Sequence, residues 1–149
     1  MSNEASHYLI GENCVLQENV TLGLKYKEGG GKTVVGNNAI IRSGSIVYGD
    51  VTIGDDFKTG HFVLVRENCR IGNDVLVGTK TVLDGDCTIG DHVRLQSGVY
   101  LSTFTKIGNK VFIGPCAVLL NDKYPVRGAY KHLAPVIEDH VSIGGNATI

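Results

Sequence analysis

Aliphatic residues recur at every sixth position along most of the chain. The series runs through Ile10, Leu16, Leu22, Val35, Ile41, Val47, Ile53, Val65, Ile71, Val77, Leu83, Ile89, Leu95, Leu101, Ile107, Ile113, Leu119, Ile137, Ile143 and Ile149. Within its central block the only exception is Thr59, which stands where an aliphatic residue is expected. A fixed period over this length is typical of a solenoid, in which each repeat packs on its neighbours.

Two positions of each six-residue unit carry the apolar pattern, and two others carry the turn. The fifth position is small or β-branched in most units, as at Ala39, Val51 and Cys69, whereas the third and fourth are often Gly, Asn or Asp. Positions one and five are therefore expected to point inward, and the polar pair to form a tight turn. A helix does not fit, because residues six apart do not share a helical face. The pattern predicts an all-β solenoid, a parallel β-helix with three short strands per coil that pair between coils about 4.8 Å apart.

Three units make one coil of 18 residues, so each unit can be assigned to a face by counting. Units 18 residues apart, such as those that start at Val47 and Val65, are expected to stack on one face. Two interruptions break the rhythm, at about residues 24–34 and 122–136, and both follow units of the face that holds Val47. The sequence therefore predicts a single domain over residues 1–149, with two loops that leave along the same edge. Such loops are favoured places for function.

Composition and charge narrow the choice of partners. The chain has 14 Lys and Arg against 15 Asp and Glu, so no charge excess favours nucleic acid or an anionic membrane. It contains no apolar stretch long enough to span a membrane, and its first residues do not have the pattern of a leader peptide. We therefore expect a soluble, cytoplasmic protein.

The individual repeats have a recognisable form. The units IGDDFK, IGNDVL, VGTKTV, IGDHVR and IGNKVF resemble the hexapeptide repeats of left-handed parallel β-helix acyltransferases. The resemblance extends over nearly the whole chain. It implies left-handed coils, an exception to the usual crossover rule. It further implies acyl transfer, with acetyl-CoA as co-substrate and no metal.

The segment VFIGPCAVLLNDKYPVR is similar to part of the nucleotide-sugar N-acetyltransferases, which acetylate an amino sugar linked to UDP or dTDP. In those relatives the loop opens with an Asn-Asp pair, followed by an aromatic residue and Pro, matched here by Asn121, Asp122, Tyr124 and Pro125. The resemblance implies a nucleotide-linked amino sugar as the small-molecule substrate. It implies substrate contacts from Ser97, Gly98, Tyr124 and Arg127, and contacts with the pantetheine arm of CoA from Gly145 and Ala147.

Position 98 departs from the pattern of these relatives. They often have QNN or QSN where this chain has Gln96, Ser97 and Gly98, so an Asn proposed to meet the acceptor amine or the thioester is replaced by Gly98. The acceptor therefore stays open. An O-acetyltransferase of small sugars and a non-catalytic trimeric scaffold remain as alternatives.

Acetyl transfer to an amine needs a base, because the nitrogen loses a proton as it attacks the thioester. Asp122 and His61 are the candidates, and Asn121 can orient the amine or donate to the developing oxyanion. Asn121 and Asp122 would also suit a capped turn at a loop entrance. His61 belongs to the one unit that starts without an aliphatic residue, and counting by 18 places it two coils, about 10 Å, from Ser97.

The same count places His61 and Asn121 at different corners of the solenoid. They could cooperate only across a subunit boundary. The resemblance implies homotrimers with active sites between adjacent protomers, so we expect the protein to be its own partner in a homotrimer.

The histidines and cysteines do not indicate a metal site or a disulfide framework. Zinc carbonic anhydrases with this kind of β-helix use two His residues five positions apart, and the sequence has no His-x4-His. Cys14, Cys69 and Cys87 occupy inward fifth positions and are expected to pack as free thiols. Cys116 stands at a turn, where packing and reactivity both remain open.

Overall fold

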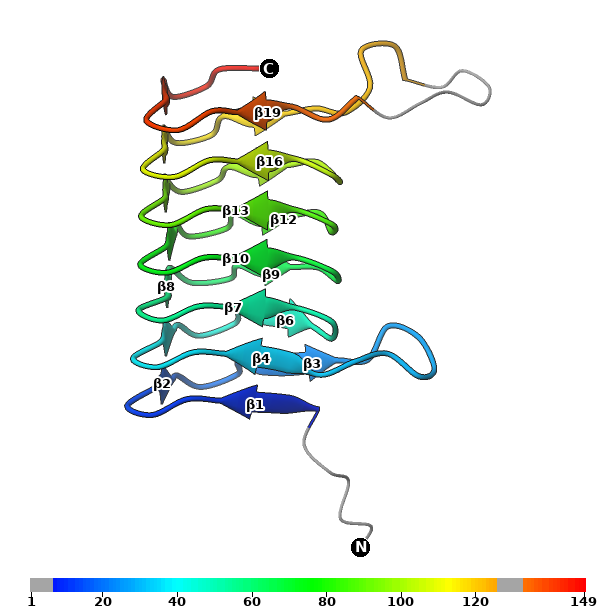
Figure 1. Ribbon diagram of the computed structural model, residues 1–149, viewed down its shortest axis with the longest axis vertical. Coiled ribbons are helices and arrows are strands. Elements are labelled where there is room, and N and C mark those ends of the chain that lie inside the picture. The colour runs from blue at the N-terminus through cyan, green and yellow to red at the C-terminus, as the bar shows by residue number, and fades with distance from the viewer. Residues whose placement is uncertain (1–6, 126–132) are drawn as a thin grey trace, which may run out of the picture.

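The computed structural model describes residues 7–125 and 133–149, which form twenty short β-strands and no helix. The strands stack into three parallel sheets that form the sides of a solenoid (Figure 1). In Figure 1, β1 and β4 run to the left in front and β3 runs to the right behind, while the chain rises towards its C-terminus. The coil is therefore left-handed, and the predicted all-β, left-handed parallel β-helix is confirmed.

Sheets one and two take one strand from each of seven coils, and sheet three takes one from each of the first six. Sheet one contains β1 (Tyr8–Ile10), β4 (Thr33–Val35), β7 (Thr52–Ile53), β10 (Arg70–Ile71), β13 (Thr88–Ile89), β16 (Lys106–Ile107) and β19 (Val136–Ile137). Sheet two contains β2 (Val15–Leu16), β5 (Ile40–Ile41), β8 (Lys58–Thr59), β11 (Leu76–Val77), β14 (Arg94–Leu95), β17 (Phe112–Ile113) and β20 (Ser142–Ile143). Sheet three contains β3 (Thr21–Leu24), β6 (Ile46–Tyr48), β9 (Leu64–Val65), β12 (Val82–Leu83), β15 (Tyr100–Leu101) and β18 (Val118–Leu119). The three faces obtained by counting are therefore the three sheets. Below, coils are numbered from β1, and corners one, two and three are the turns that follow sheets one, two and three.

The interior is filled by the first and fifth positions of the units, as predicted. Val47 and Leu83 are fully buried first-position residues, and Val51 and Cys87 are buried fifth-position residues. Each aliphatic side chain buried in this way contributes about 1.5–3 kcal/mol. The first coil differs, because Leu16 of the aliphatic series remains 38% exposed.

The turns depend on a left-handed backbone at the fourth position. Asn38, Asp56, Asn68 and Asp74 occupy this position with φ between 49° and 59°. Asn and Asp tolerate this conformation better than other residues with a side chain, which explains the polar turns of the sequence. Phe62, with φ 56°, is a bulky exception.

Corner one carries a ladder of Asn and Asp side chains at the third position. The Oδ1 atom of each accepts a hydrogen bond from the third-position backbone N–H of the preceding coil, over 2.6–2.9 Å. Glycine precedes most of them because a Cβ at Gly36, for example, would lie 2.4 Å from Asp55 Oδ1. The ladder alternates strictly along the chain as Asn37, Asp55, Asn73, Asp91, Asn109 and Asp139. Carboxylates therefore lie two coils apart, about 10 Å, instead of about 4.8 Å.

Both loops leave from corner three, as predicted, and Figure 1 shows them on the same side of the solenoid. The first joins β3 to β4 and the second joins β18 to β19. Leu24, Thr33 and Val34, expected in the first loop, belong to the flanking strands, and so does Val136, expected in the second loop. Thr33 is fully buried and its hydroxyl donates to the Tyr48 carbonyl, 2.6 Å away, which fixes the end of the loop.

Candidate functional site

His61 lies at corner two in the turn after β8. Its Nδ1 atom lies 2.8 Å from Ser43 Oγ in the preceding coil, and its backbone N–H donates to Thr79 Oγ1 in the following coil, 3.2 Å away. The residue is exposed, and its ring lies beside that of Phe62, with the ring centroids 6.4 Å apart. One ring nitrogen of His61 is therefore held by the protein on an otherwise accessible side chain.

Thr59, the exception in the aliphatic series, changes the strand ladder next to His61. Its buried hydroxyl accepts a hydrogen bond from the Arg42 backbone N–H, 2.9 Å away. In the regular coils this bond goes to a carbonyl, as from Gly60 to Val77. The Thr59 carbonyl accepts instead from the Arg42 guanidinium. The sequence exception thus marks a local rearrangement two residues before His61.

The other corner-two residues stack as the 18-residue count predicted. Backbone N–H groups of Lys80 and Cys116 donate to the carbonyls of His61 and Ser97, each 2.9 Å away, and link successive turns. The column continues to Gly145, since the Asn146 N–H donates to the Pro115 carbonyl. His61, Ser97 and Gly145 therefore share one corner.

Gly98 and Cys116 occupy neighbouring turns of that corner. Gly98 has φ 72°, and a Cβ there would lie 3.2 Å from Cys116 Sγ. Cys116 is exposed, whereas Cys69 and Cys87 are buried, and all the cysteines of the described residues are free. Cys87 is enclosed with Cys69 beside it, and both this hydrogen-bonded neighbour and burial raise the pKa of its thiol. The Asn of the related sequences would crowd Cys116 in this chain.

A hollow of about 350 Å³ lies at the N-terminal end of corner two. It is lined by Leu16, Gln17, Glu18 and Ser43. The Gln17 Oε1 atom accepts a hydrogen bond from the Ser43 backbone N–H, 3.2 Å away. Ser43 therefore contacts both His61 and the hollow, and it connects the candidate base to a space where a small acceptor could lie.

Asn121 and Asp122 lie at corner three, where the second loop leaves. Asn121 Nδ2 donates to the Thr103 carbonyl of the preceding coil, 3.1 Å away, and Asp122 Oδ1 accepts from the Tyr124 N–H, 2.8 Å away. The side-chain bond of Asn121 takes the place of the backbone bond that other turns make between coils, as from Asp86 to Glu67. Tyr124 is 57% exposed, and Arg127 lies outside the described residues.

A polar network lies between the two loops along corner three. Arg66 is hydrogen-bonded to both carboxylate oxygens of Glu67 and, through NH1, to Asp84 Oδ1, 3.0 Å away. The Tyr100 hydroxyl donates to Asp84 Oδ2 over 2.8 Å, and burial together with this carboxylate raises the pKa of Tyr100 to about 12. The phenol therefore stays protonated at neutral pH, and the network is fixed as a hydrogen-bonded unit.

The first loop is held by one carboxylate. Asp50 accepts hydrogen bonds from the Tyr26 hydroxyl, 2.6 Å away, and from the Gly31 N–H, 2.8 Å away. The Tyr26 hydrogen bond is the main cause that lowers the pKa of Asp50. Two hydrogen bonds therefore hold this loop on the solenoid. A loop that was only tolerated as an insertion would not need them.

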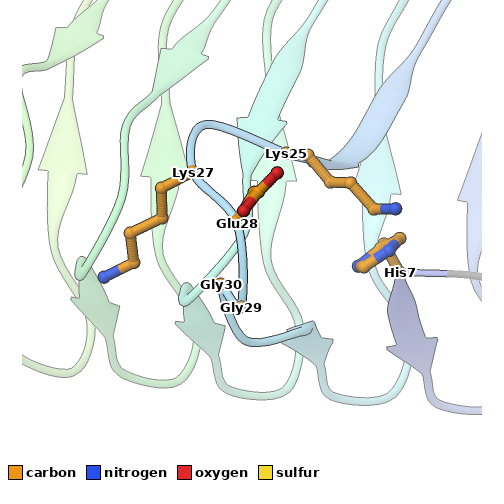
Figure 2. Close-up of a pocket in the computed structure, with 6 residues that line it drawn as sticks. All are labelled: His7, Lys25, Lys27, Glu28, Gly29 and Gly30. Carbon is orange, nitrogen blue, oxygen red and sulfur yellow. The ribbon is translucent and has the colours of Figure 1, made fainter.

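A second hollow, of about 410 Å³, lies under this loop (Figure 2). His7, Lys25, Lys27, Glu28, Gly29 and Gly30 line it. Figure 2 shows Lys25 directed towards His7 and Lys27 directed the opposite way, where its ammonium lies 5.1 Å from the centre of the Tyr26 ring. The two lysines therefore do not converge on one point.

The structure does not bring His61 and Asn121 together within one protomer. His61 lies at corner two in coil three, and Asn121 at corner three in coil six. The offset along the solenoid is three coils, about 14 Å. A threefold axis parallel to the solenoid would keep this offset, so Asn121 of a second copy would lie at a different level from His61.

Neither a metal-binding group nor a membrane-spanning helix is found in the described part of the chain. Among residues 7–125 and 133–149, no three His, Cys, Asp or Glu side chains form a group that could hold a metal ion. The same residues include no helix of the length and apolarity needed to cross a membrane.

A family model described as the bacterial transferase hexapeptide, of six repeats, matches residues 68–103 and 86–121. Residues 68–121 therefore match the hexapeptide repeats of this family. No curated protein matches the sequence significantly.

Two solved structures share the fold. The acetyltransferase domain of PglB from Neisseria gonorrhoeae, in complex with acetyl coenzyme A, is similar with a TM-score of 0.68 and 18% identity over 87% of this chain and 53% of that one. UDP-N-acetylglucosamine O-acyltransferase (LpxA) from Moraxella catarrhalis gives a TM-score of 0.50 and 21% identity over 96% of this chain and 65% of that one. The chain thus spans about half of the first protein's length and less than two thirds of the second's.

The segment expected to contact CoA offers an open backbone. Gly144 and Gly145 are exposed, and a Cβ built on Gly144 would meet no atom within 4 Å. Ala147 is partly buried against the core, and its carbonyl accepts from the Val118 N–H, 2.8 Å away. An extended amide chain can approach the two glycines, so the residues present fit a pantetheine arm.

Several residues around the site were not predicted from the sequence. Ser43 and Arg42 belong to the unit before His61, and their side chains act across coils, on His61 and Thr59. Asp50 holds a loop from 19 to 24 residues away. The only available signal was spacing, since Ser43 stands 18 residues before His61, where a regular turn would have Asn or Asp.

Proposed function

We propose that the protein is an acetyl-CoA-dependent acyltransferase that N-acetylates a nucleotide-linked amino sugar. The observation that carries the proposal is the exposed ring of His61, held at Nδ1 by Ser43 beside a hollow that can take a small acceptor. The likeness of the fold to an acetyltransferase domain in complex with acetyl coenzyme A supports the choice of donor.

His61 serves as the general base in this proposal. The thioester supplies an activated acetyl group, and the acceptor nitrogen forms a C–N bond to it as the C–S bond breaks. His61 takes the proton that the nitrogen loses and returns one to the departing sulfur, so that CoA leaves as the thiol. A positioned base of this kind contributes about 10²–10⁴-fold in rate.

The remaining candidates have supporting roles in the proposal. Gly145 and Ala147 contact the pantetheine arm, whose course along corner two from Gly145 to His61 would cover four coils, about 19 Å. Ser97 and Gly98 lie along that course. We place His61 ahead of Asp122 as the base because Asp122 Oδ1 already accepts the Tyr124 N–H.

Asn121 and the second loop lie three coils, about 14 Å, from His61 towards the C-terminus, so in this proposal they bind the nucleotide end of the acceptor and not its amine. Asn121 uses Nδ2 to bond the Thr103 carbonyl, so its Oδ1 is the atom offered to a substrate. Asp122, Tyr124 and Arg127 would contribute contacts to the nucleotide-linked sugar, and Tyr124 has the exposed ring that such a contact needs.

An O-acetyltransferase of small hydroxyl acceptors is the second candidate. It is favoured by Gly98, because the chain lacks the Asn that N-acetylating relatives often have there. A non-catalytic trimeric scaffold is the alternative without chemistry, and the regularity of the coils suits it.

We also propose a homotrimer, in which corners two and three of adjacent protomers face each other. The outward side chains of sheet three support this assembly, since they form a row of partly buried apolar and aromatic residues, Ile46, Leu64, Val82, Tyr100 and Val118. On sheet one the corresponding residues Thr52, Arg70, Thr88 and Lys106 are exposed and polar. Sheet three is therefore better suited than sheet one to contact a second copy. We also propose a cytoplasmic location, which the free thiols support.

An acceptor panel tests the reaction. Release of free CoA from acetyl-CoA is measured with UDP- and dTDP-linked amino sugars, and with the matching hydroxyl sugars as controls. Amine-dependent release supports N-acetylation, and release with the hydroxyl sugars alone supports O-acetylation. No release with either set would overturn the proposed enzyme in favour of the scaffold.

A further inference from the structure

Ser43 is the only residue of its unit whose hydroxyl reaches His61. Ser43 Oγ and His61 Nδ1 are 2.8 Å apart, a short hydrogen bond between two exposed turns of adjacent coils. Either group can be the donor, and the choice decides which nitrogen of a neutral imidazole carries the proton. If the Ser43 hydroxyl donated, the neutral ring would carry its proton on Nε2. The lone pair on Nδ1 would then accept the hydrogen bond from Ser43.

The turn that carries Ser43 is fixed on several sides. Its backbone N–H donates to Gln17 Oε1 over 3.2 Å, and its carbonyl accepts from the Phe62 N–H over 3.1 Å. Gly44 follows with φ 73°, and a Cβ at Gly44 would lie 2.3 Å from Phe62 Cδ1, so the Phe62 ring packs directly over this glycine. The unusual left-handed Phe62 therefore clamps the turn that presents the hydroxyl, and Ser43 is positioned before any substrate arrives.

His61 is held on its other side as well. Its backbone N–H donates to Thr79 Oγ1, and its carbonyl accepts from the Lys80 N–H. Backbone and ring are therefore fixed by different coils, with Ser43 as the described contact at a ring nitrogen. A second described contact of the ring, with Phe62, is a tilted aromatic one that does not select a tautomer.

We propose that Ser43 accepts a hydrogen bond from Nδ1–H of His61 and is the residue that positions this histidine, keeping the Nε2 lone pair free for the acceptor proton. Ser43 acts through His61 and is a positioning residue. This inference deepens the proposed acyl transfer and rests on it for its purpose, but the proton placement stands as a property of the free protein.

The test reads the tautomer directly and does not depend on activity. Side-chain ¹⁵N resonances of the histidines are recorded for the parent, with His61 assigned by its loss in His61→Gln. The comparison includes Ser43→Ala, Ser43→Thr and the control Thr88→Ala, an exposed residue of sheet one. Ser43→Thr is compatible with the turn, because Thr79 and Thr103 occupy the same position of their units.

The parent, Ser43→Thr and Thr88→Ala are expected to show protonated Nδ1 and unprotonated Nε2. Ser43→Ala is expected to shift the ring towards the Nε2-protonated form, the one favoured by imidazole free in water. A parent ring protonated at Nε2, or an unchanged tautomer in Ser43→Ala, would overturn the proposal. Circular dichroism of each variant shows whether the fold is retained.

Kinetics distinguish this proposal from the proposed function. With an acceptor that releases CoA, Ser43→Ala is expected to lower kcat about tenfold with KM unchanged, and Ser43→Thr to recover it. If the parent shows the expected tautomer but acetylates no acceptor, the proposed acyl transfer is wrong and the proposed protonation of His61 at Nδ1 still holds. If the parent acetylates an acceptor but His61 is protonated at Nε2, only the proposed role of Ser43 is wrong.

Discussion

Asp91 Oδ1 accepts a hydrogen bond from the backbone N–H of Asn73 over 2.7 Å and a second from Asn73 Nδ2 over 3.2 Å. The same relationship joins Asn109 to Asp139, where hydrogen bonds from Asn109 hold the pKa of the Asp139 carboxyl below its usual value. A lowered pKa means that the contribution of Asp139 to stability is present above about pH 4 and is lost as the pH falls through the pKa of the folded state.

The alternation of this ladder leads to the first prediction. Asn73→Asp places three carboxylates, with Asp55 and Asp91, about 4.8 Å apart in successive coils. Each new pair costs about 0.9 kcal/mol in water at low salt, so the variant is expected to lose about 1–2 kcal/mol of unfolding free energy at pH 7. Protonation removes the repulsion between carboxylates, and the loss should therefore disappear as the pH is lowered below about 4.

Denaturant unfolding at pH 7 and pH 3, with and without salt, checks this. Asn146→Asp is the matched control, because it adds the same charge at an exposed turn whose neighbour in the column is Cys116. Equal stability of Asn73→Asp and Asn146→Asp at pH 7 would mean that the alternation has no electrostatic role.

The second prediction concerns the first loop. Asp50→Ala removes the acceptor of both Tyr26 and Gly31, so residues 25–32 should open and trypsin should cut after Lys25 or Lys27. Asp86→Ala is the control, because Asp50 and Asp86 share corner three and have φ of 60° and 50°. Both variants then bear the same backbone cost of Ala in a left-handed turn. Equal cleavage of the two would contradict the anchoring role of Asp50.

Much of the fold could be predicted from the sequence, whereas the anchors could not. The period of six places Val47 over Val65 because spacing alone decides which residues stack. The roles of Thr59, Asp50 and Asn121 depend on which side-chain oxygen or amide reaches a neighbouring coil, and this is set by rotamers and by small shifts of the turn. The sequence marked Thr59 as an exception but could not indicate that its hydroxyl replaces a ladder carbonyl.

The third prediction tests Asn121 apart from catalysis. Asn121→Ala and Asn121→Asp both remove the donor to the Thr103 carbonyl, and Asp also brings an anionic oxygen towards that carbonyl. We expect a loss of about 1 kcal/mol for Ala and more for Asp at pH 7. Hydrogen exchange over residues 118–125 should rise in the same order. Unchanged exchange in both variants would show that the loop entrance does not depend on this amide.

The fourth prediction concerns assembly. Val82→Lys places a charge in the middle of the apolar row on sheet three and should lower the mass measured by light scattering from that of the proposed trimer to that of a monomer. Thr88→Lys adds the same charge on sheet one, in a strand that pairs regularly with its neighbours, and should leave the trimer intact. A trimer that survives Val82→Lys but not Thr88→Lys would place the interface on sheet one.

Binding of the acetyl donor is the most direct test of the proposed function, because it can be measured without knowing the acceptor. Isothermal titration of acetyl-CoA into the parent protein is expected to give saturable binding, weakened in Gly145→Val, where a Cβ would already approach the Pro115 carbonyl at 3.2 Å. Circular dichroism confirms that the variant is folded. Saturable binding by the parent would support an acyltransferase on this hexapeptide-repeat solenoid. No heat and no thermal shift at millimolar acetyl-CoA, about the upper end of typical enzyme KM values, would contradict it.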